Sequence, residues 1–388
     1  MKNNPRTLSD VERRDWLRLS RTENVGQITF RQLLRRFGSA QAALEALPSM
    51  AQRGGKRSFA IPPVSAVEDE IARSRKYGAK IIALNEPDYP EALAAIEDAP
   101  PLLTVLGDVS LLHKRILGIV GARNASLNGR KMAENLARNL GEQSIVIASG
   151  MARGIDTAAH QGSLPTGSIA VLAGGIDVVY PEENRALYDK LAEQGCIISD
   201  QPLGCEPYAK LFPRRNRLIS GLSLGVIVVE AARQSGSLIT ARMALEQGRE
   251  VFAVPGSPLD PRCAGTNDLI RQGAVLTEGA SDILGHIHAL PAGLSETSKP
   301  ELETPESSIN EDDLFHARDI VLESLGPSPV SIDELIRECV LPASTVMMVL
   351  LELELAGRIE RQPGQKIVLI GAASEEDLFE TGVRSALG

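Results

Sequence analysis

The sequence predicts an α/β protein: a doubly wound, Rossmann-like sheet, a small helical domain before it and a winged helix after it. The main evidence is a series of short apolar runs, most of which lead into a glycine-containing turn and a helical stretch. Such runs fit strands buried on both faces, as happens when helical crossovers cover a parallel sheet. The runs span residues 116–120, 144–148, 168–172, 224–229 and 251–254.

The first 75 residues are expected to form a small helical domain of the sterile-alpha-motif or helix-hairpin-helix kind. Leu33, Leu34 and Phe37 share one face of an amphipathic helix that ends at Gly38, and residues 24–28 form a tight turn before it. Some modules of this kind grip nucleic-acid backbones and others only pack against protein. The residues leave both roles open.

The sheet domain is expected over residues 76–290, and the C-terminal region follows a different pattern. Residues 291–313 are rich in Pro, Ser, Thr and Glu without periodicity, which predicts a disordered linker. Three helices and a hairpin then follow in the order of a winged helix, which we place at 314–372 before an acidic tail at 373–388. The helices are expected at 314–325, 331–338 and 342–356, and the hairpin at 357–370.

The composition excludes several classes of protein. The four cysteines form no Cys-x-x-Cys pair, so neither a zinc site nor a disulfide framework is expected. The N-terminus lacks an apolar signal region, and no run of 18 apolar residues occurs. These features predict a cytoplasmic protein without a membrane segment.

The net charge of −9 does not argue against a nucleic-acid partner, because it is unevenly distributed. Residues 291–313 hold seven acidic residues and one lysine, and residues 371–388 hold four acidic residues and one arginine. Residues 1–57 instead hold twelve Lys and Arg against five Asp and Glu. Binding follows the local field rather than the total charge.

The most informative segment for function spans residues 207–223. It carries four cations, Lys210, Arg214, Arg215 and Arg217, with the ring of Phe212 among them and no acidic residue. Cations at short spacing suit phosphates, and a ring suits an unstacked base, so the segment fits a single strand of nucleic acid. The alternative is a solvated basic loop that packs Phe212 into the core.

Several strand-to-helix turns carry glycine beside small hydroxyl residues. Glycine lets the backbone approach an anion closely, and a helix N-terminus offers free N–H donors. Turns of this kind lie at the edge of the sheet where such folds bind ligands. The residues placed to meet phosphate are Ser149, Gly150, Ser235, Ser237, Gly265 and Thr266, with Arg123 and Arg153 supplying charge.

Motifs for nucleotide cofactors and covalent catalysis are missing. The sequence has no Gly-x-x-x-x-Gly-Lys-Ser/Thr and no Gly-x-Gly-x-x-Gly. Its Gly-x-Ser-x-Gly at residues 221–225 leads into an expected strand, so it does not form the strand-to-helix elbow of a nucleophilic serine. Asp156 and Glu230 could serve as acid–base groups, but Asp156 heads a helix, where a capping role is common, and Glu230 ends a strand. We therefore expect no cofactor, no metal and no catalysis.

Together these motifs resemble the DNA-processing protein A (DprA/Smf) family. They cover about residues 80–285, and their number and order make the resemblance specific. The helical module and the winged helix also resemble accessory domains of that family. The matching segments are 121–123, 149–160, 173–181 with Asn184, 212–223, 230–231, 235–240, 254–256 and 265–267.

The resemblance implies a protein without enzymatic activity that binds single-stranded DNA during natural transformation. It would protect the incoming strand, help to load the RecA recombinase onto it, and act as a homodimer. By motif, the principal DNA contacts would be Arg123 and the segment from Lys210 through Phe212, Arg214, Arg215 and Asn216 to Arg217. Ser149, Gly150, Arg153, Ser235 and Ser237 would add contacts from the glycine turns.

Two other functions compete with this interpretation. A nucleotide phosphoribohydrolase could share the Rossmann-like sheet, but its Pro-Gly-Gly-x-Gly-Thr turn is present here only in separated pieces, 254–256 and 265–266. A winged-helix transcription regulator is the second. The expected third helix has no Lys, Arg, Asn or Gln over residues 343–354 with which to read base edges.

Overall fold

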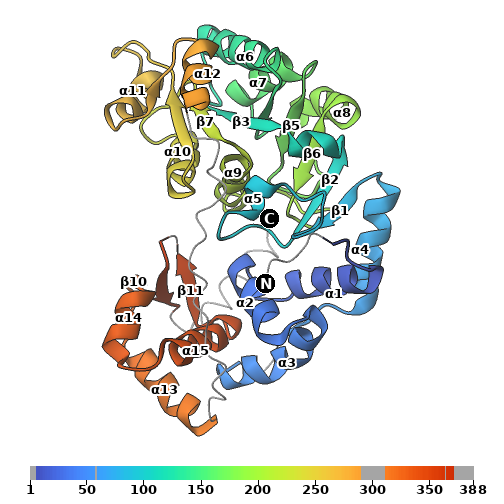
Figure 1. The fold of residues 1–388 in the computed structure, drawn as a ribbon, viewed down its shortest axis with the longest axis vertical. Helices are drawn as coiled ribbons and strands as arrows, with labels where there is room; N and C mark the ends of the chain where they lie inside the picture. The colour runs from blue at the N-terminus through green and yellow to red at the C-terminus, as the bar shows by residue number, and fades with distance from the viewer. Residues whose placement is uncertain (1–5, 57–58, 290–310, 363, 371–388) are drawn as a thin grey trace, which may run out of the picture. The chain divides into compact units, whose positions relative to one another are not determined.

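The computed structural model describes residues 6–56, 59–289, 311–362 and 364–370 (Figure 1). It divides into two compact units, one made of Met1–Leu17 with Pro63–Ser295 and the other of Arg18–Pro62 with Glu296–Gly388. The predicted fold class is confirmed, with a mixed α/β sheet, an N-terminal helical module and a C-terminal winged helix. Most of the expected linker and the acidic tail lie outside the described residues.

The first unit is built on a nine-stranded sheet with the order β1-β2-β6-β5-β4-β3-β7-β8-β9. From β6 to β9 every neighbouring pair is parallel, whereas β1 and β2 are added antiparallel at one edge. The strands are β1 Lys80–Ala83, β2 Leu102–Gly107, β3 Arg115–Val120, β4 Ile145–Ser149, β5 Ser168–Val171, β6 Cys196–Ser199, β7 Gly225–Val228, β8 Glu250–Ala253 and β9 Val275–Leu276.

Helices cover both faces of this sheet, which is why its central strands are apolar throughout (Figure 1). One core layer packs α5 (Glu91–Ala94), α9 (Leu211–Leu222), α10 (Gly236–Glu246) and α11 (Ala264–Arg271) against the strands. The other packs α6 (Leu127–Gly141), α7 (Ile155–Ser163) and α12 (Ala280–Ala289). A smaller cluster lies under α8 (Arg185–Gln194), and α4 (Val64–Lys76) precedes β1. The fold is therefore doubly wound.

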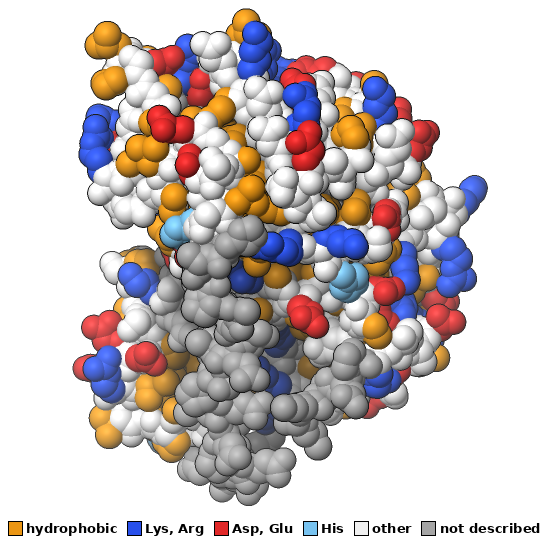
Figure 2. Space-filling model, turned by 45° about the horizontal axis from the view of Figure 1, so that its top comes forward, with side chains coloured by type: hydrophobic (Ala, Val, Ile, Leu, Met, Phe, Trp, Pro, Cys, Tyr) orange, Lys and Arg blue, Asp and Glu red, His pale blue; other side chains and the backbone are white. Residues whose placement is uncertain are grey.

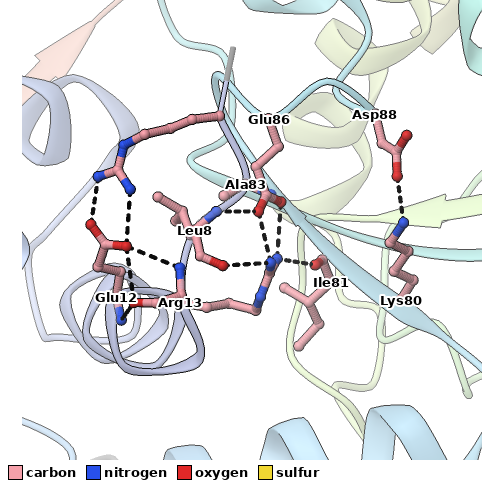
Figure 3. Close-up of polar contacts among 10 residues, drawn as sticks. Leu8, Glu12, Arg13, Lys80, Ile81, Ala83, Glu86 and Asp88 are labelled. Atoms are coloured by element: carbon pink, nitrogen blue, oxygen red, sulfur yellow. Dashed lines mark hydrogen bonds and ion pairs between the residues drawn. The ribbon is translucent and has the colours of Figure 1, made fainter. Parts of the chain in front are cut away.

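The chain before β1 is fastened to the first unit by a partly buried ion pair (Figure 3). Arg13 of α1 (Asp10–Ser20) donates to both carboxylate oxygens of Glu86, at 2.7 and 2.9 Å, and to the carbonyl of Ile81 at 2.7 Å. The backbone N–H groups of Leu8 and Ala83 donate to the same carboxylate. Burial raises the pKa of Glu86, but these hydrogen bonds outweigh it and hold the pKa below its usual value.

The second unit contains N-terminal helices and the winged helix. Gly38 adopts φ 73° and ends α2 (Gln27–Phe37) as the sequence predicts, and Ser39 caps α3 (Ala40–Arg53). Ser331 likewise caps α14 (Ile332–Cys339), while α13 (Glu311–Glu323) begins three residues earlier than expected. The third helix, α15, spans Ala343–Leu355. A three-stranded antiparallel sheet, β10-β12-β11, completes the winged helix with β10 Val330–Ser331, β11 Ile359–Gln362 and β12 Lys366–Leu369.

Within this unit α15 packs against α3 through a fully buried carboxylate. Glu352 accepts hydrogen bonds from Arg53 of α3 at 2.6 Å and from Arg318 of α13 at 2.8 Å, and its side chain is 0% exposed. At Gly54 a Cβ would lie 2.1 Å from the Glu352 carbonyl oxygen, so only glycine fits there. Asn24 adds a hydrogen bond to the carbonyl of Leu355 at 3.0 Å. Segments from opposite ends of the sequence thus share one core.

Candidate nucleic-acid interface

The candidate interface lies at the carboxyl ends of β3, β4 and β5, next to the point where the sheet reverses its winding. β3 stands between β4 and β7, so the chain proceeds outward from it first in one direction and then in the other. Open α/β sheets bind ligands at such a point. The turns after β3 and β4, the loop after β5 and the start of α9 supply the side chains discussed below.

Glu230 joins the turns that follow β3 and β7. Its carboxylate accepts hydrogen bonds from the Ser126 N–H at 2.9 Å and from the Ser126 hydroxyl at 2.6 Å. The Ser126 hydroxyl in turn accepts from the Gly129 N–H and caps α6. Glu230 is buried and held by these bonds, which is a structural role for a carboxylate that the sequence offered as an acid–base candidate.

Arg215 is a buried cation beneath the turn after β4. It is 5% exposed and donates to the carbonyls of Gly150, at 2.6 Å, and Val171. A Cβ at Gly150 would lie 2.1 Å from the Arg215 guanidinium, so the glycine is required by this close approach. The sequence placed both residues among the DNA contacts, and the structure brings them together below the surface.

Arg217 is also buried, at 5% exposure, and is paired inside the protein. It forms an ion pair with Asp200 at 2.7 Å and lies 3.6 Å from a carboxylate oxygen of Asp98. It also donates to the Asp98 carbonyl. The burial of Arg215 and Arg217 does not support direct contact of either residue with DNA. Both side chains lie on the inner side of α9 and bind groups of the protein itself.

The exposed cations of this region lie at the start of α9 and in the turn after β3. Lys210, Arg214 and Arg123 are exposed, whereas Phe212 is half-buried. The Arg123 guanidinium lies over the Phe212 ring, 5.0 Å from its centroid, as in a cation–π contact. Among the residues that the structure describes, Lys210 and Arg214 have no ion-pair partner. The side chains of Arg123, Lys210 and Arg214 can therefore meet an anion.

Gly154 holds the Arg123 turn in place. Its backbone has φ 77°, and a Cβ there would lie 2.4 Å from the Ala122 carbonyl oxygen and 2.6 Å from that of Arg123. The Ile155 N–H, next in the chain, donates to the Ala122 carbonyl. A glycine in the turn after β4 thus fixes the loop that presents Arg123.

A ring that the sequence interpretation did not include also lies here. Tyr180 belongs to the loop after β5, is 50% exposed, and contacts Phe212 with ring centroids 5.5 Å apart and planes tilted by 53°. In the sequence its only signal was its place in a family-like motif, because a lone Tyr before Pro181 shows no periodicity. The contact joins segments 32 residues apart.

The remaining predicted site residues are distributed around this cluster. The Ser149 hydroxyl is buried and donates to the Ile119 carbonyl at 2.6 Å, and Asn216 accepts from Arg215 at 3.2 Å. Arg153 is exposed and pairs with Glu183. Ser235 caps α10, and its hydroxyl is hydrogen-bonded to the Ser237 hydroxyl at 2.7 Å. Within the described part of the chain, no hydrogen bond joins either serine to Arg123 or Phe212. Ser235 and Ser237 therefore belong to a separate turn.

Two titratable groups are buried beneath the turn after β4. Burial raises the pKa of Asp156 to about 6, although Arg215 and the N–H groups of Ala152 and Gly150 act to lower it. Burial lowers the pKa of His160 to about 3, and the charge of Arg215 lowers it further. His160 is hydrogen-bonded to the Ser168 hydroxyl at 2.8 Å. Both side chains lie in the interior rather than at the surface of the site.

On the face shown in Figure 2, basic and acidic side chains are interspersed. Attraction for an anion therefore depends on local clusters of cations. Among the described residues no group of three or more His, Cys, Asp or Glu side chains could hold a metal ion. None of the helices in that same part is long and apolar enough to cross a membrane.

Comparisons with known proteins settle the family. The model of DNA recombination-mediator protein A matches residues 80–288, more than half of the chain. The chain belongs to the DNA processing protein A family. Two further models of the family match the flanks, the DprA-like N-terminal HHH domain at residues 10–72 and the DprA winged helix domain at 304–365.

Relatives in this family are similar over most of their length. Protein Smf of Escherichia coli is 38% identical over 312 residues, which cover 78% of this chain and 80% of the relative. DNA processing protein DprA of Bacillus subtilis is 45% identical over 216 residues, 55% of this chain and 73% of that protein.

Solved structures of DprA proteins share the fold. The X-ray structure of DprA from Streptococcus pneumoniae superposes with a TM-score of 0.60 at 32% identity, covering 72% of this chain and 98% of that one. The structure of Helicobacter pylori DprA, described for its single-stranded DNA binding mode, has a TM-score of 0.50 at 28% identity and covers 54% and 95%.

Proposed function

We propose that this protein binds single-stranded DNA in natural transformation and catalyses no reaction. The observation that carries the proposal is the cluster in which Arg123 lies over Phe212 beside the exposed Lys210 and Arg214. Cations next to a ring offer a phosphate partner and a stacking surface within one nucleotide's reach. The single-strand binding described for the Helicobacter pylori protein supports the same function.

The site residues divide by exposure. Arg123, Lys210 and Arg214 contact phosphates, and Phe212 contributes a face to a base. Arg215 and Arg217 act from the interior by holding α9 against the sheet and against Asp200. Ser149 and Gly150 shape the turn above Arg215, while Arg153, Asn216, Ser235 and Ser237 remain candidate contacts around it.

We propose the absence of catalysis because the carboxylates of Glu230 and Asp156 are both engaged in hydrogen bonds inside the protein. Glu230 is bound to Ser126, and Asp156 accepts from the N–H groups of Gly150 and Ala152 at 3.2 and 3.3 Å. Each side chain is buried and satisfies backbone donors, which is the usual structural role of a carboxylate near a helix N-terminus. A phosphoribohydrolase would release free base from nucleoside monophosphates, and we expect none.

The wider role follows from the family. We propose that the protein protects the incoming strand, promotes loading of the RecA recombinase, and acts as a homodimer in the cytoplasm. The description of the matching family model as a recombination mediator supports the RecA role. Loading is tested by following RecA filament growth on a strand already covered by a single-strand binding protein.

The direct test is a binding titration with single-stranded, double-stranded and mononucleotide ligands across salt. Affinity for single strands should exceed that for duplex, with little dependence on sequence. The logarithm of the binding constant should fall with the logarithm of salt at a slope of about −0.7 per neutralised phosphate. Equal affinity for duplex, or an affinity independent of salt, would contradict the proposal.

A further inference from the structure

Tyr180 is the more accessible of the two rings at the interface. It is 50% exposed, whereas Phe212 is half-buried. The Arg123 guanidinium, 5.0 Å from the Phe212 centroid, already lies over that ring. More of Tyr180 than of Phe212 is therefore open to a base that approaches from solvent.

The backbone that carries Tyr180 is anchored on both sides. Its neighbours Val179 and Pro181 are buried. A few residues on, the Asn184 side chain donates to the Met151 carbonyl at 2.8 Å, which ties this loop to the turn after β4. An exposed ring on a fixed backbone loses little conformational freedom when it binds a ligand.

The other end of the same loop is tied to the segment before α9. The Gly175 N–H donates to the Cys205 carbonyl at 2.8 Å, and the Asp177 carboxylate accepts from the Gly204 N–H at 2.8 Å. Because α9 begins at Leu211 and carries Phe212, these bonds link the loop of Tyr180 to the segment that leads into Phe212. The tilt of 53° at 5.5 Å leaves the ring planes inclined rather than stacked on each other.

We propose that Tyr180 is a stacking residue for an unpaired nucleobase of single-stranded DNA, and that it forms the outer ring of a two-ring site with Phe212. This inference rests on the proposed function and assigns a specific residue to it. Arg123 lies over the Phe212 ring and meets the phosphate that follows the stacked base. Bases inside a duplex have no free face to offer, so the site selects unpaired strands of any sequence.

The test uses the full-length protein and a single-stranded oligonucleotide carrying one 2-aminopurine, whose fluorescence reports stacking. Tyr180→Ala should weaken binding about 5- to 100-fold, the loss expected for one stacked base, and should abolish the fluorescence change. Tyr180→Phe should retain both, because the ring rather than the hydroxyl makes the contact. Leu259→Ala removes a side chain that is 93% exposed and serves as the surface control.

An abasic version of the same oligonucleotide separates stacking from charge. Wild type and Tyr180→Ala should bind the abasic strand equally, and the salt dependence should be the same for both proteins, because a ring releases no counterions. If the wild type binds the intact strand and Tyr180→Ala binds it equally well, the inference is wrong while the proposed function stands. If the wild type binds no single strand, the proposed function itself fails.

Discussion

Neighbouring arginines on α9 have different environments. Arg214 is exposed, whereas Arg217 is buried against Asp200 and Asp98. The sequence places both in one basic segment and could not separate them, because the partners of Arg217 lie 17 and 119 residues away. Charge along the sequence indicated a candidate site, and only tertiary contacts decide which of its cations faces solvent.

Substitution of these two arginines should therefore give different defects. Arg217→Ala removes the buried ion pair with Asp200, so we expect the free energy of unfolding to fall by about 3–5 kcal/mol. Arg214→Ala should leave stability within about 0.5 kcal/mol of the wild type and reduce the salt slope of single-strand binding by about 0.7. Urea unfolding and salt-dependent titration measure the two effects. A stable Arg217→Ala protein would contradict the buried pairing.

The buried side chains of Asp156 and His160 should each make the stability of the protein depend on pH, in opposite directions. The folded-state pKa of Asp156 is raised from 3.8 to about 6, so its contribution to stability is lost as pH rises from about 4 through 6. The pKa of His160 is lowered from 6.5 to about 3, so its contribution is lost as pH falls through the same window. The two effects oppose each other in the wild type.

Asp156→Asn should leave His160 as the remaining source of this pH dependence of the free energy of unfolding. Between pH 4 and 6 the free energy of unfolding of the variant should rise relative to that of the wild type by about 2 kcal/mol, since each pKa unit is worth about 1.4 kcal/mol. Urea unfolding at pH 4, 5 and 6 gives this difference. A difference between the two proteins that stays constant over that range would show that Asp156 titrates normally.

The third helix of the winged helix illustrates what sequence can predict about an element. The lack of Lys, Arg, Asn and Gln over residues 343–354 indicated that α15 does not read bases. The structure gives each of its two acidic residues a partner inside the second unit. Glu352 contacts Arg53 and Arg318, and Glu354 contacts Arg361 at 2.9 Å. The burial of Glu352 was not predictable, because Arg53 lies 299 residues earlier.

Glu352→Gln should loosen two helices at once. The change removes the charge that compensates Arg53 and Arg318, and loss of one partner from a buried pair typically costs about 3–5 kcal/mol. We expect faster amide hydrogen exchange in both α3 and α15. Glu360→Gln, at an exposed carboxylate on β11, is the matched control and should change neither helix. Faster exchange confined to α15 would show that α3 does not depend on this contact.

Across the whole molecule, the sheet was predictable where its strands are buried on both faces. The five apolar runs correspond to β3, β4, β5, β7 and β8. Missed were β1, β2, β6 and β9, which are two to six residues long; β1, β2 and β9 lie toward the edges of the sheet. The antiparallel pairing of β2 with β6 joins segments about 90 residues apart, which no local pattern of the sequence indicates. The domain boundaries remain a prediction.

Removal of the winged helix should leave the interface working. A truncation ending near residue 290 keeps the turns after β3 and β4 and the whole of α9, so single-strand affinity should stay within tenfold of the full chain. The same titration across salt measures it. A loss of more than about 1.4 kcal/mol, which is tenfold in the constant, would place the C-terminal region in the DNA site.

Arg53 and Glu352, which form a contact in the folded protein, are synthesised at different times. The ribosome makes Glu352 299 residues after Arg53, and at about 5–20 residues per second this takes roughly 15–60 s. During that interval the surface around Gly54 has no native partner on its own chain. The Glu352 of a neighbouring nascent chain is chemically the same, so exchange of α15 between copies is the assembly error that this connectivity favours.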